Sequence, residues 1–256
     1  MLSEKVIVIT GGAGLIGKEF SKAVVQNRGT LIIADINEEI GNDVKDKLKN
    51  EFKQSKIDFL KIDISSKESI QICIAQIIEK YGKIDALVNN AYPRNVNYGR
   101  NFFDVEYTDF NENVGLHLGG YFLTSQQFAE TFKTQGFGNI INMGSIYGVV
   151  APRFEIYDDT NMSMPIEYAV IKSSIIFMTK YMAKYFQGMN IRVNCISPGG
   201  ILNNQSNDFL KRYNEYGMTK GMLDVKDLIG SFVFLLSDNS KYINGQNIII
   251  DDGWTL

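Results

Sequence analysis

The sequence predicts an α/β protein built on one parallel sheet of seven strands, with helices on both faces. Seven short runs rich in branched apolar residues recur along the 256 residues, and segments with apolar residues three and four apart lie between them. The runs do not alternate polar with apolar residues, which is typical of parallel strands covered on both sides. The expected strands are 6–9, 31–34, 59–62, 86–88, 140–143, 191–196 and 247–250.

The whole chain, 1–256, is expected to be a single doubly wound domain. It contains only four prolines and no Ser/Gly-rich or single-sign tract that would indicate a linker. Three segments exceed what a minimal sheet needs: 92–103, 151–166 and 200–222. Each follows a strand at its carboxyl end, where open α/β sheets bind ligands, so we expect them to form a substrate pocket. The last of them, which contains glycines at 200, 217 and 221, is either a lid or a mobile surface loop.

Composition narrows the class of partner. Lys and Arg number 26 against 29 Asp and Glu, a formal charge of -3, so neither nucleic acid nor an anionic membrane is expected to bind. No run of 18 apolar residues occurs and no basic leader precedes the first strand, which favours a cytoplasmic protein. Cys73 and Cys195 lie in apolar stretches and are expected to be buried thiols. With one histidine in the chain, no metal site is expected.

A glycine-rich turn follows the first strand. Residues 10–17 read T-G-G-A-G-L-I-G, in which Gly12, Gly14 and Gly17 match G-x-G-x-x-G, and a helix is expected to begin near Lys18. Glycines there permit a tight turn and close approach of a pyrophosphate, and the helix amino terminus offers free N–H groups to an anion. The turn therefore predicts a dinucleotide site. The alternative is a turn that only packs a helix on a strand.

Two acidic residues follow the next strands. Asp35 ends the second strand, 18 residues after Gly17, where a carboxylate accepts hydrogen bonds from the ribose hydroxyls of NAD and would repel the 2′-phosphate of NADP. NAD is therefore the expected cofactor, and a helix cap is the alternative role for Asp35. Asp63 follows the third strand, where it either meets the adenine or caps a helix.

The reactive groups lie in the second half of the chain. Tyr168 and Lys172 are four residues apart in a helical segment, 167–185, so they share a face, and the ammonium is expected to lower the pKa of the phenol. Ser145 ends the fifth strand in Asn-Met-Gly-Ser, and the fourth strand ends in Asn-Asn-Ala at 89–91. A tyrosine and a lysine on one helix face, together with a serine at a strand end, suit proton transfer to or from a hydroxyl.

Taken together, these motifs resemble the short-chain dehydrogenase/reductase family over essentially the whole chain. The resemblance implies a Rossmann fold in which Tyr168 is the general acid/base, Lys172 binds the nicotinamide ribose and Ser145 holds the substrate oxygen. The turn 198–201 resembles the family's contact to the carboxamide. The cofactor contacts implied in this way are Gly11, Gly12, Gly14, Leu15, Ile16, Gly17, Asp35, Ile36, Asp63, Ile64, Asn90, Ala91, Tyr168, Lys172, Pro198, Gly199 and Ile201.

Two positions depart from the family. The family usually has an asparagine in N-L-x-G-x-F, and this chain has His117 there. In the family that asparagine helps to hold a water that links the lysine to solvent, so His117 is a candidate catalytic residue as a proton relay, or it fills a buried gap. Tyr92 replaces the glycine usual after Asn-Asn-Ala and is expected to form an aromatic wall near the nicotinamide.

The loop before Tyr168 is the third departure. Twenty-two residues separate Ser145 from Tyr168, more than the family commonly has, and 151–162 mixes aromatic rings with polar groups. Such walls suit sugars, with Tyr157 a candidate contact. The alternative is a surface excursion packed on another subunit. Arg94, Arg100 and Arg153 would hold a phosphate or carboxylate if their loops converge, or are ordinary surface arginines.

The long loop and residues 91–94 resemble family members of bacterial surface-polysaccharide and flagellin-glycan pathways. That resemblance implies a sugar phosphate, an amino sugar or a nucleotide sugar as substrate. The expected function is NAD-dependent hydride transfer at a secondary alcohol or ketone of that substrate. The glycine spacing also resembles sugar-modifying enzymes of the family's extended branch, so one alternative is an epimerase or dehydratase that retains its NAD. Another is a catalytically silent NAD-binding partner protein.

Association of the chain with itself is also expected. Apolar residues on the helical segment and in the tail exceed what one core face needs, which favours a homodimer or a homotetramer, and the family resemblance implies the tetramer. The residues on which this expectation depends are Ile175, Ile176, Met178, Met182 and the tail Trp254, Thr255 and Leu256.

Overall fold

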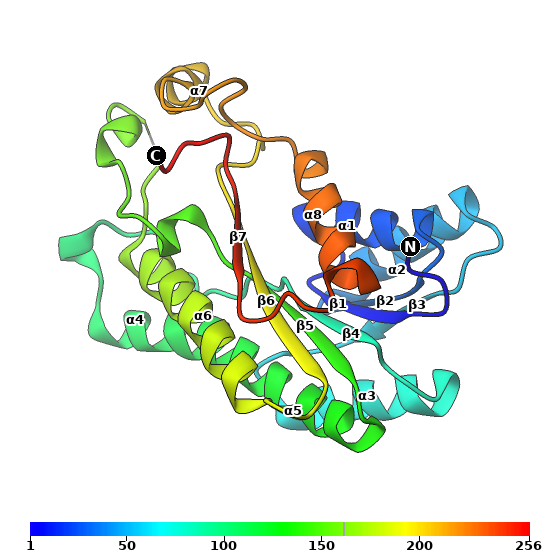
Figure 1. Cartoon of the computed structure of the whole chain (residues 1–256). Coiled ribbons are helices and arrows are strands. Elements are labelled where there is room, and N and C mark those ends of the chain that lie inside the picture. The colour runs from blue at the N-terminus through cyan, green and yellow to red at the C-terminus, as the bar shows by residue number, and fades with distance from the viewer. Residues whose placement is uncertain (161) are drawn as a thin grey trace.

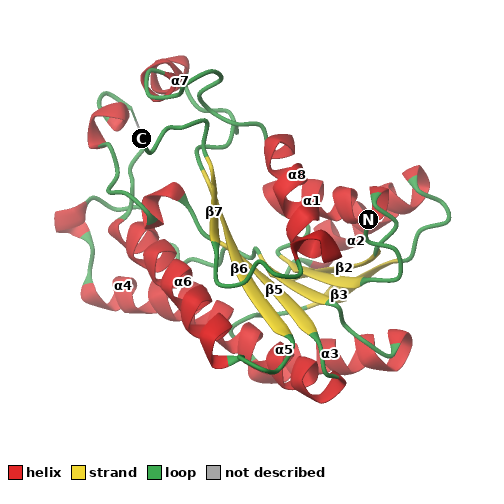
Figure 2. Ribbon diagram, in the orientation of Figure 1, coloured by secondary structure: helices red, strands yellow, loops and turns green. Residues whose placement is uncertain are grey.

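In the computed structural model, which describes residues 1–160 and 162–256, the seven expected strands form one parallel sheet (Figures 1 and 2). The strand order is β3-β2-β1-β4-β5-β6-β7, a doubly wound order, so the predicted fold class is confirmed. The bounds are β1 Val6–Thr10, β2 Thr30–Asp35, β3 Ile57–Lys61, β4 Ala86–Asn89, β5 Gly138–Met143, β6 Ile191–Pro198 and β7 Asn247–Ile250.

Helices cover both faces of the sheet, and each face has its own apolar core. In β1, Ile7 and Ile9 face the core beneath α1, α2 and α8, whereas Val6 and Val8 face the core beneath α3, α5 and α6. Because both faces are buried, the strand reads as an unbroken apolar run. The helices are α1 Leu15–Gln26, α2 Glu38–Glu51, α3 Lys67–Tyr81, α4 Tyr107–Val114, α5 Gly120–Gln135, α6 Ile166–Tyr185, α7 Asn207–Asn214 and α8 Ile229–Leu236.

Helix α1 begins earlier than predicted. It starts at Leu15, directly after its N-cap Gly14, and not near Lys18. Leu15 is exposed, so the first turn lacks the apolar periodicity that marks a buried helix face in the sequence. The glycine turn therefore passes into the helix without a spacer.

The three extra segments leave the carboxyl ends of β4, β5 and β6, and each contains a short helix. A 3₁₀ turn, Phe102–Asp104, lies at the end of the first and another, Phe154–Tyr157, lies in the second. The third contains α7, whose cap Ser206 accepts a hydrogen bond from the amide of Phe209. Trp254, after β7, is buried beneath α7, where its indole stacks on Tyr213 and donates to that residue's carbonyl.

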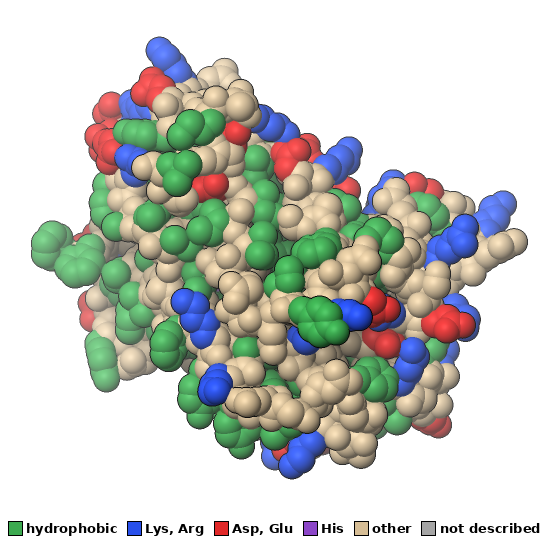
Figure 3. All heavy atoms as spheres, viewed as in Figure 1, with side chains coloured by type: hydrophobic (Ala, Val, Ile, Leu, Met, Phe, Trp, Pro, Cys, Tyr) green, Lys and Arg blue, Asp and Glu red, His purple; other side chains and the backbone are tan. Residues whose placement is uncertain are grey.

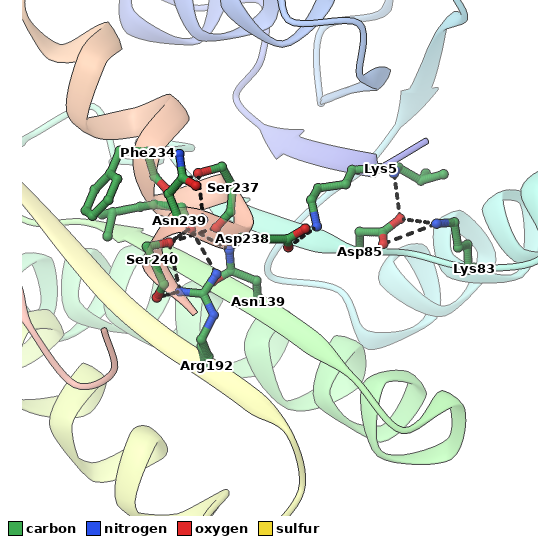
Figure 4. Close-up of polar contacts among 12 residues, drawn as sticks. Lys5, Lys83, Asp85, Asn139, Arg192, Phe234, Ser237, Asp238, Asn239 and Ser240 are labelled. Atoms are coloured by element: carbon green, nitrogen blue, oxygen red, sulfur yellow. Dashed lines mark hydrogen bonds and ion pairs between the residues drawn. The ribbon is translucent and has the colours of Figure 1, made fainter. Parts of the chain in front are cut away.

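The amino ends of the strands are held by polar contacts (Figure 4). Arg192, at the start of β6, donates to carbonyl oxygens at the end of α8 and in the turn that follows it, at 2.9–3.3 Å. Lys5, just before β1, pairs with Asp238 of the same turn at 2.7 Å. The turn after α8 is thereby attached to two strands.

Most of the residues on which the oligomer expectation depended are wholly or partly buried in the chain's own cores, which corrects that argument for all of them except the exposed Leu256. Ile175 and Met182 are buried in the chain's own cores, as is Trp254. The exposed apolar side chains of α6 are instead Phe177, Tyr181 and Tyr185. Figure 3 shows hydrophobic side chains gathered over α4 and α6.

Two further findings concern the described part of the chain. Cys73 and Cys195 are separate buried thiols, as predicted. None of the helices in residues 1–160 and 162–256 combines the length and the apolar character that crossing a bilayer requires.

Candidate active site

A cavity of about 1170 Å³ opens at the carboxyl edge of the sheet, and all three extra segments contribute to its wall. This is the place where the sequence predicted a pocket. The predicted site residues that line it are Gly11, Gly14, Leu15, Ile16, Asp35, Ile36, Asp63, Ile64, Asn90, Ala91, Tyr92, Arg94, Ser145, Tyr157, Tyr168, Lys172, Pro198, Gly199 and Ile201. Gly12, Gly17, His117 and Arg153 do not line it.

The glycine turn is packed tightly against the end of β4. Gly11 has a φ of +61°, and a Cβ on it would lie 2.7 Å from the Cα of Ala91. Asn90 donates to the carbonyls of Thr10 and Gly11 at 3.1 and 3.0 Å and so holds the turn in place. A Cβ on Gly17 would collide with the Gly11 carbonyl oxygen. Gly17 therefore serves the packing beneath the cavity.

The amino terminus of α1 suits an anion. Its first turn carries no acidic side chain, and the N-cap Gly14 supplies no capping hydrogen bond from a side chain. The first amide groups of a helix lack intrahelical acceptors, and the helix dipole favours negative charge beside them. The wall formed by Gly14, Leu15 and Ile16 therefore offers hydrogen-bond donors to a phosphate.

Neither acidic residue caps the following helix, contrary to the alternative left open by the sequence. Asn37 caps α2 and Ser66 caps α3. Asp35 instead accepts hydrogen bonds from the amides of Ala13 and Asn37, at 3.1 and 3.0 Å, and so joins β2 to the glycine turn. Asp63 accepts from the amide and hydroxyl of Ser65. Both carboxylates also line the cavity.

Ser145, Tyr168 and Lys172 line the same cavity because α6 packs closely on the end of β5. Ser145 begins a 3₁₀ turn, Ile146–Gly148, and its hydroxyl accepts from the amide of Tyr147 at 3.2 Å. A Cβ on Gly148 would lie 2.6 Å from the Lys172 carbonyl carbon, so only glycine permits this approach. Lys172 Nζ donates to the Met143 carbonyl at 2.7 Å and lies 5.6 Å from the Tyr168 ring centroid.

Burial governs the protonation of this group of residues. It lowers the pKa of Lys172 from 10.5 to about 8. It also raises the pKa of the Tyr168 phenol above its usual value, although a hydrogen bond with Ser145 acts in the opposite direction. The expected lowering of the phenol pKa is thus wrong in direction for the chain alone, because desolvation outweighs the hydrogen bond with Ser145. Both groups are protonated at neutral pH.

His117 lies behind Lys172. It belongs to a single π-helical turn, Gly115–Gly119, between α4 and α5, and its side chain is buried between Tyr92 and Tyr121, with ring centroids 5.1 and 5.0 Å away. Its Nε2 lies 3.5 Å from Lys172 Nζ. Burial and the nearby ammonium hold the pKa of the imidazole well below its usual value. The neutral ring is therefore an acceptor facing Lys172, and its part in proton transfer stays a prediction.

Tyr92 lines the cavity and contacts several other residues of its wall. Its ring packs edge-on against Tyr168, with centroids 5.9 Å apart, and its hydroxyl donates to the Tyr98 hydroxyl at 2.6 Å. Lys172 Nζ and the Arg94 guanidinium carbon lie 5.9 and 5.1 Å from its ring centroid. The residue that replaces a glycine in the family pattern thus joins the reactive pair to the 92–103 segment.

The three arginines do not converge. Arg100 pairs with Asp109 at 3.3 Å. The Arg153 guanidinium lies over the rings of Tyr216 and Trp254, 4.1 and 5.0 Å from their centroids. These aromatic faces draw Arg153 away from the cavity, so its assignment to the substrate site is wrong. Arg94 alone of the three lines the cavity.

Sequence reasoning missed several residues of the substrate wall. Tyr147 lines the cavity beside the predicted Tyr157, and their hydroxyls lie 2.9 Å apart. Tyr213, from α7, accepts a hydrogen bond from the Gly200 amide at 2.5 Å. Tyr98 also lines the cavity. The position of Tyr147, two residues after Ser145, is the one signal that pointed to the site, since a short turn after the serine keeps neighbouring side chains near it.

Comparison with known proteins agrees with this site. A family model described as enoyl-(acyl carrier protein) reductase matches residues 12–255. The chain is 47% identical over 257 residues to a post-translational flagellin modification protein A from Campylobacter coli, with 100% of both chains covered. It is 32% identical to a 7alpha-hydroxysteroid dehydrogenase from Bacteroides fragilis, over 98% of this chain and 95% of the relative.

A solved structure is also similar throughout. The crystal structure of a short chain dehydrogenase from Leptospira borgpetersenii with bound NAD+ superposes with a TM-score of 0.87 at 34% identity, covering 100% of this chain and 94% of that one. The shared fold, the full-length identity and the arrangement of Ser145, Tyr168 and Lys172 lead to one conclusion. This chain belongs to the short-chain dehydrogenase/reductase family of oxidoreductases.

Proposed function

We propose that the protein is an NAD-dependent oxidoreductase that transfers a hydride between the nicotinamide and a secondary alcohol or ketone of a carbohydrate-type substrate. The candidate substrates are a sugar phosphate, an amino sugar and a nucleotide sugar. The observation that carries the proposal is that Ser145, Tyr168 and Lys172 line the same cavity as the glycine turn and Asp35. One cavity thus holds both a dinucleotide site and an acid/base group.

The residues at the adenosine end fit NAD. Asp35 is fixed by two backbone amides, which leaves its carboxylate at the cavity wall where ribose hydroxyls would donate to it. Its neighbour Ile36 is apolar, and the cations that line the cavity are Arg94 and Lys172, from β4's loop and α6, so nothing at this end balances a 2′-phosphate. The Leptospira relative, described with bound NAD+, supports the same choice.

The side chains divide the chemistry among themselves. NAD, when bound, accepts or supplies the hydride. Tyr168 takes the proton from the substrate hydroxyl as a phenolate in oxidation, and gives it back as a phenol in reduction, while Ser145 holds the same oxygen by a hydrogen bond. Lys172 donates to the Met143 carbonyl, which fixes its ammonium near the phenol. A cation there stabilises the phenolate, which oxidation requires and reduction produces.

We further propose that the substrate belongs to flagellin or surface-glycan biosynthesis in bacteria. The Campylobacter relative is named for flagellin modification and matches this chain from end to end. Aromatic and amide side chains of the substrate wall suit a sugar, since rings pack on C–H faces and amides bond to hydroxyls. They include Tyr147, Tyr157, Asn203 and Gln205.

We also propose a homodimer or homotetramer, located in the cytoplasm. Phe177, Tyr181 and Tyr185 form an exposed aromatic row on α6, which favours burial against another copy. Sedimentation at several protein concentrations tests this assembly, and a monomer at all concentrations would exclude it.

The test of the function is NADH formation over a panel of amino sugars, sugar phosphates and nucleotide sugars. We expect wild type to form NADH with part of the panel and Tyr168→Phe to form none, while both bind NADH more tightly than NADPH. Tighter binding of NADPH would overturn the role of Asp35. Substrate conversion without net NADH would favour an enzyme that returns the hydride to the same sugar.

A further inference from the structure

The charged residues of the cavity are separated along its length. Its carboxylates are Asp35 and Asp63, which follow β2 and β3 at the cofactor end. Its cations are Lys172, beside the phenol of Tyr168, and Arg94, in the segment that follows β4. The wall that surrounds the substrate beyond Tyr168 therefore contains one charged side chain, a guanidinium.

Arg94 is not neutralised by the protein. In the described part of the chain it forms no ion pair, whereas Arg100 and Arg212 are each paired with an aspartate. Its guanidinium instead lies 5.1 Å from the Tyr92 ring centroid and 6.0 Å from that of Tyr98. Cation–π contact with the two rings holds the guanidinium in place, and its five N–H donors are more than a hydrogen bond with Tyr92 can occupy.

The support beneath Arg94 is itself fixed. The Tyr92 and Tyr98 rings are perpendicular, with centroids 5.9 Å apart, and their hydroxyls are hydrogen-bonded. The base of the segment is tied to α4, because Asn95 donates to Asp109 at 2.8 Å and accepts from Asn113 at 3.2 Å. A cation held by such a platform is preorganised, which reduces the entropy cost of binding.

The distance to the chemistry suits one small sugar. Tyr92 contacts both the Tyr168 ring and the Arg94 guanidinium, at 5.9 and 5.1 Å between centres. The Tyr168 ring and the Arg94 guanidinium therefore lie no more than about 11 Å apart, which one sugar with a charged substituent can span. The other polar side chains of the substrate wall are neutral, among them Tyr147, Tyr157, Asn203 and Gln205.

We propose that Arg94 binds an anionic group of the substrate, a phosphate or a carboxylate carried by the sugar, and so selects charged sugars over neutral ones. This inference rests on the proposed function, since it takes Tyr168 as the reacting end of the cavity. A guanidinium binds either anion through two parallel hydrogen bonds. Neutral sugars would leave that fork without an acceptor and bind more weakly.

The experiment measures binding separately from turnover. Quenching of the fluorescence of enzyme-bound NADH is titrated with matched probes: glucose, glucose 6-phosphate and glucuronate, and then N-acetylglucosamine, its 6-phosphate and its uridine diphosphate ester. The variants are Arg94→Gln and Arg94→Lys. Arg100→Gln is the matched control, because it removes the same charge from the same segment outside the cavity.

We expect wild type to bind at least one anionic probe about 10- to 100-fold more tightly than its neutral partner, with the preference weakened by salt. Arg94→Gln should lose it, Arg94→Lys should keep part of it, and Arg100→Gln should keep all of it. The preferred probe distinguishes phosphate, carboxylate and nucleotide diphosphate as the source of the anion. NADH formation with the same probes reports on the proposed function independently.

Four results would overturn the inference. They are equal binding of neutral and anionic probes, an unchanged preference in Arg94→Gln, an equal loss in Arg100→Gln, and no binding of any anionic probe. Turnover of neutral sugars without anion preference would refute this inference and leave the oxidoreductase function standing. Anion-selective binding without NADH formation from any probe would support this inference and count against the oxidoreductase function.

Discussion

Two cations at opposite ends of the sheet have opposite surroundings. Arg192, at the amino end of β6, donates to the carbonyls of Leu235, Ser240 and Ile243 and to the Ser240 hydroxyl (Figure 4). Lys172, at the carboxyl end of β5, is 5% exposed, donates to one carbonyl at 2.7 Å and faces a neutral imidazole at 3.5 Å. The fold supplies four acceptor atoms to Arg192 and two to Lys172.

This difference separates a structural cation from a reactive one. Burial lowers the pKa of both groups, but a guanidinium starts so high that Arg192 stays charged at any physiological pH. Lys172, with a pKa of about 8, is held near the range in which enzymes work. With one N–H on the Met143 carbonyl and another facing His117, one N–H is left for a ligand hydroxyl. The number of acceptors that the fold supplies is thus what sets the two roles apart.

The largest expected effect comes from removing the ammonium group of Lys172. In Lys172→Met we expect NADH formation to fall by about 10³-fold, because the phenolate loses its stabilising charge. The melting temperature should not fall, since a desolvated ammonium is removed. Lys180→Met, at an exposed position of the same helix, is the control and should retain activity. A substantial loss of stability in Lys172→Met would contradict the comparison.

Removing the Arg192 guanidinium should instead lower stability and leave activity intact. Arg192→Met leaves several carbonyls without donors, and we expect it to lower the free energy of unfolding by about 3 kcal/mol. Activity per folded molecule should stay near that of wild type. Urea denaturation and active-site titration measure the two quantities. Lys5→Met, which breaks a partly exposed ion pair to Asp238, should cost less than about 1 kcal/mol.

The pH dependence of stability provides a finer test. The pKa of Lys172 is lower in the folded chain than its usual 10.5, so the unfolded chain binds more protons between about pH 8 and 10.5. Stability relative to Lys172→Met should therefore rise with pH through this window, by roughly 3 kcal/mol in total. The measurement is urea denaturation of both proteins at intervals across the window. A flat difference would show that Lys172 is not desolvated.

The smallest effect concerns the second acceptor of Lys172. Because the neutral ring of His117 faces the ammonium, His117→Leu should reduce activity by about 3- to 10-fold and change the alkaline limb of the pH–rate profile. His117→Asn, which keeps an acceptor, should restore both. If the leucine and asparagine variants behave alike, His117 only fills space.

The sequence predicted well whatever depends on near neighbours in the chain. Strand β7 begins and ends at the predicted residues, and the other strands differ by no more than two residues at either end, because apolar runs report burial directly. The pairing of Tyr168 with Lys172 followed from their spacing on one helix. The glycine turn was recognisable because its residues are consecutive.

What failed depended on partners that are distant in the sequence. Arg153 was assigned to the cavity, but its aromatic partners are distant in the sequence: Tyr216 lies in the 200–222 segment and Trp254 follows β7. Tyr213 reaches Gly200 only because α7 folds back over the turn. The predicted direction of the pKa shift of Tyr168 was wrong, because residue spacing reveals a nearby cation but not how far the phenol is desolvated.

Trp254 has a consequence for anyone who redesigns this enzyme. Its indole contacts Tyr147 after β5, Arg153 in the second segment and Tyr213 and Tyr216 in the third. A loop transplanted from another member of the family would meet this indole without the partner that evolved beside it. The loops that determine substrate range are therefore coupled through Trp254. A successful loop exchange must replace these loops together with Trp254.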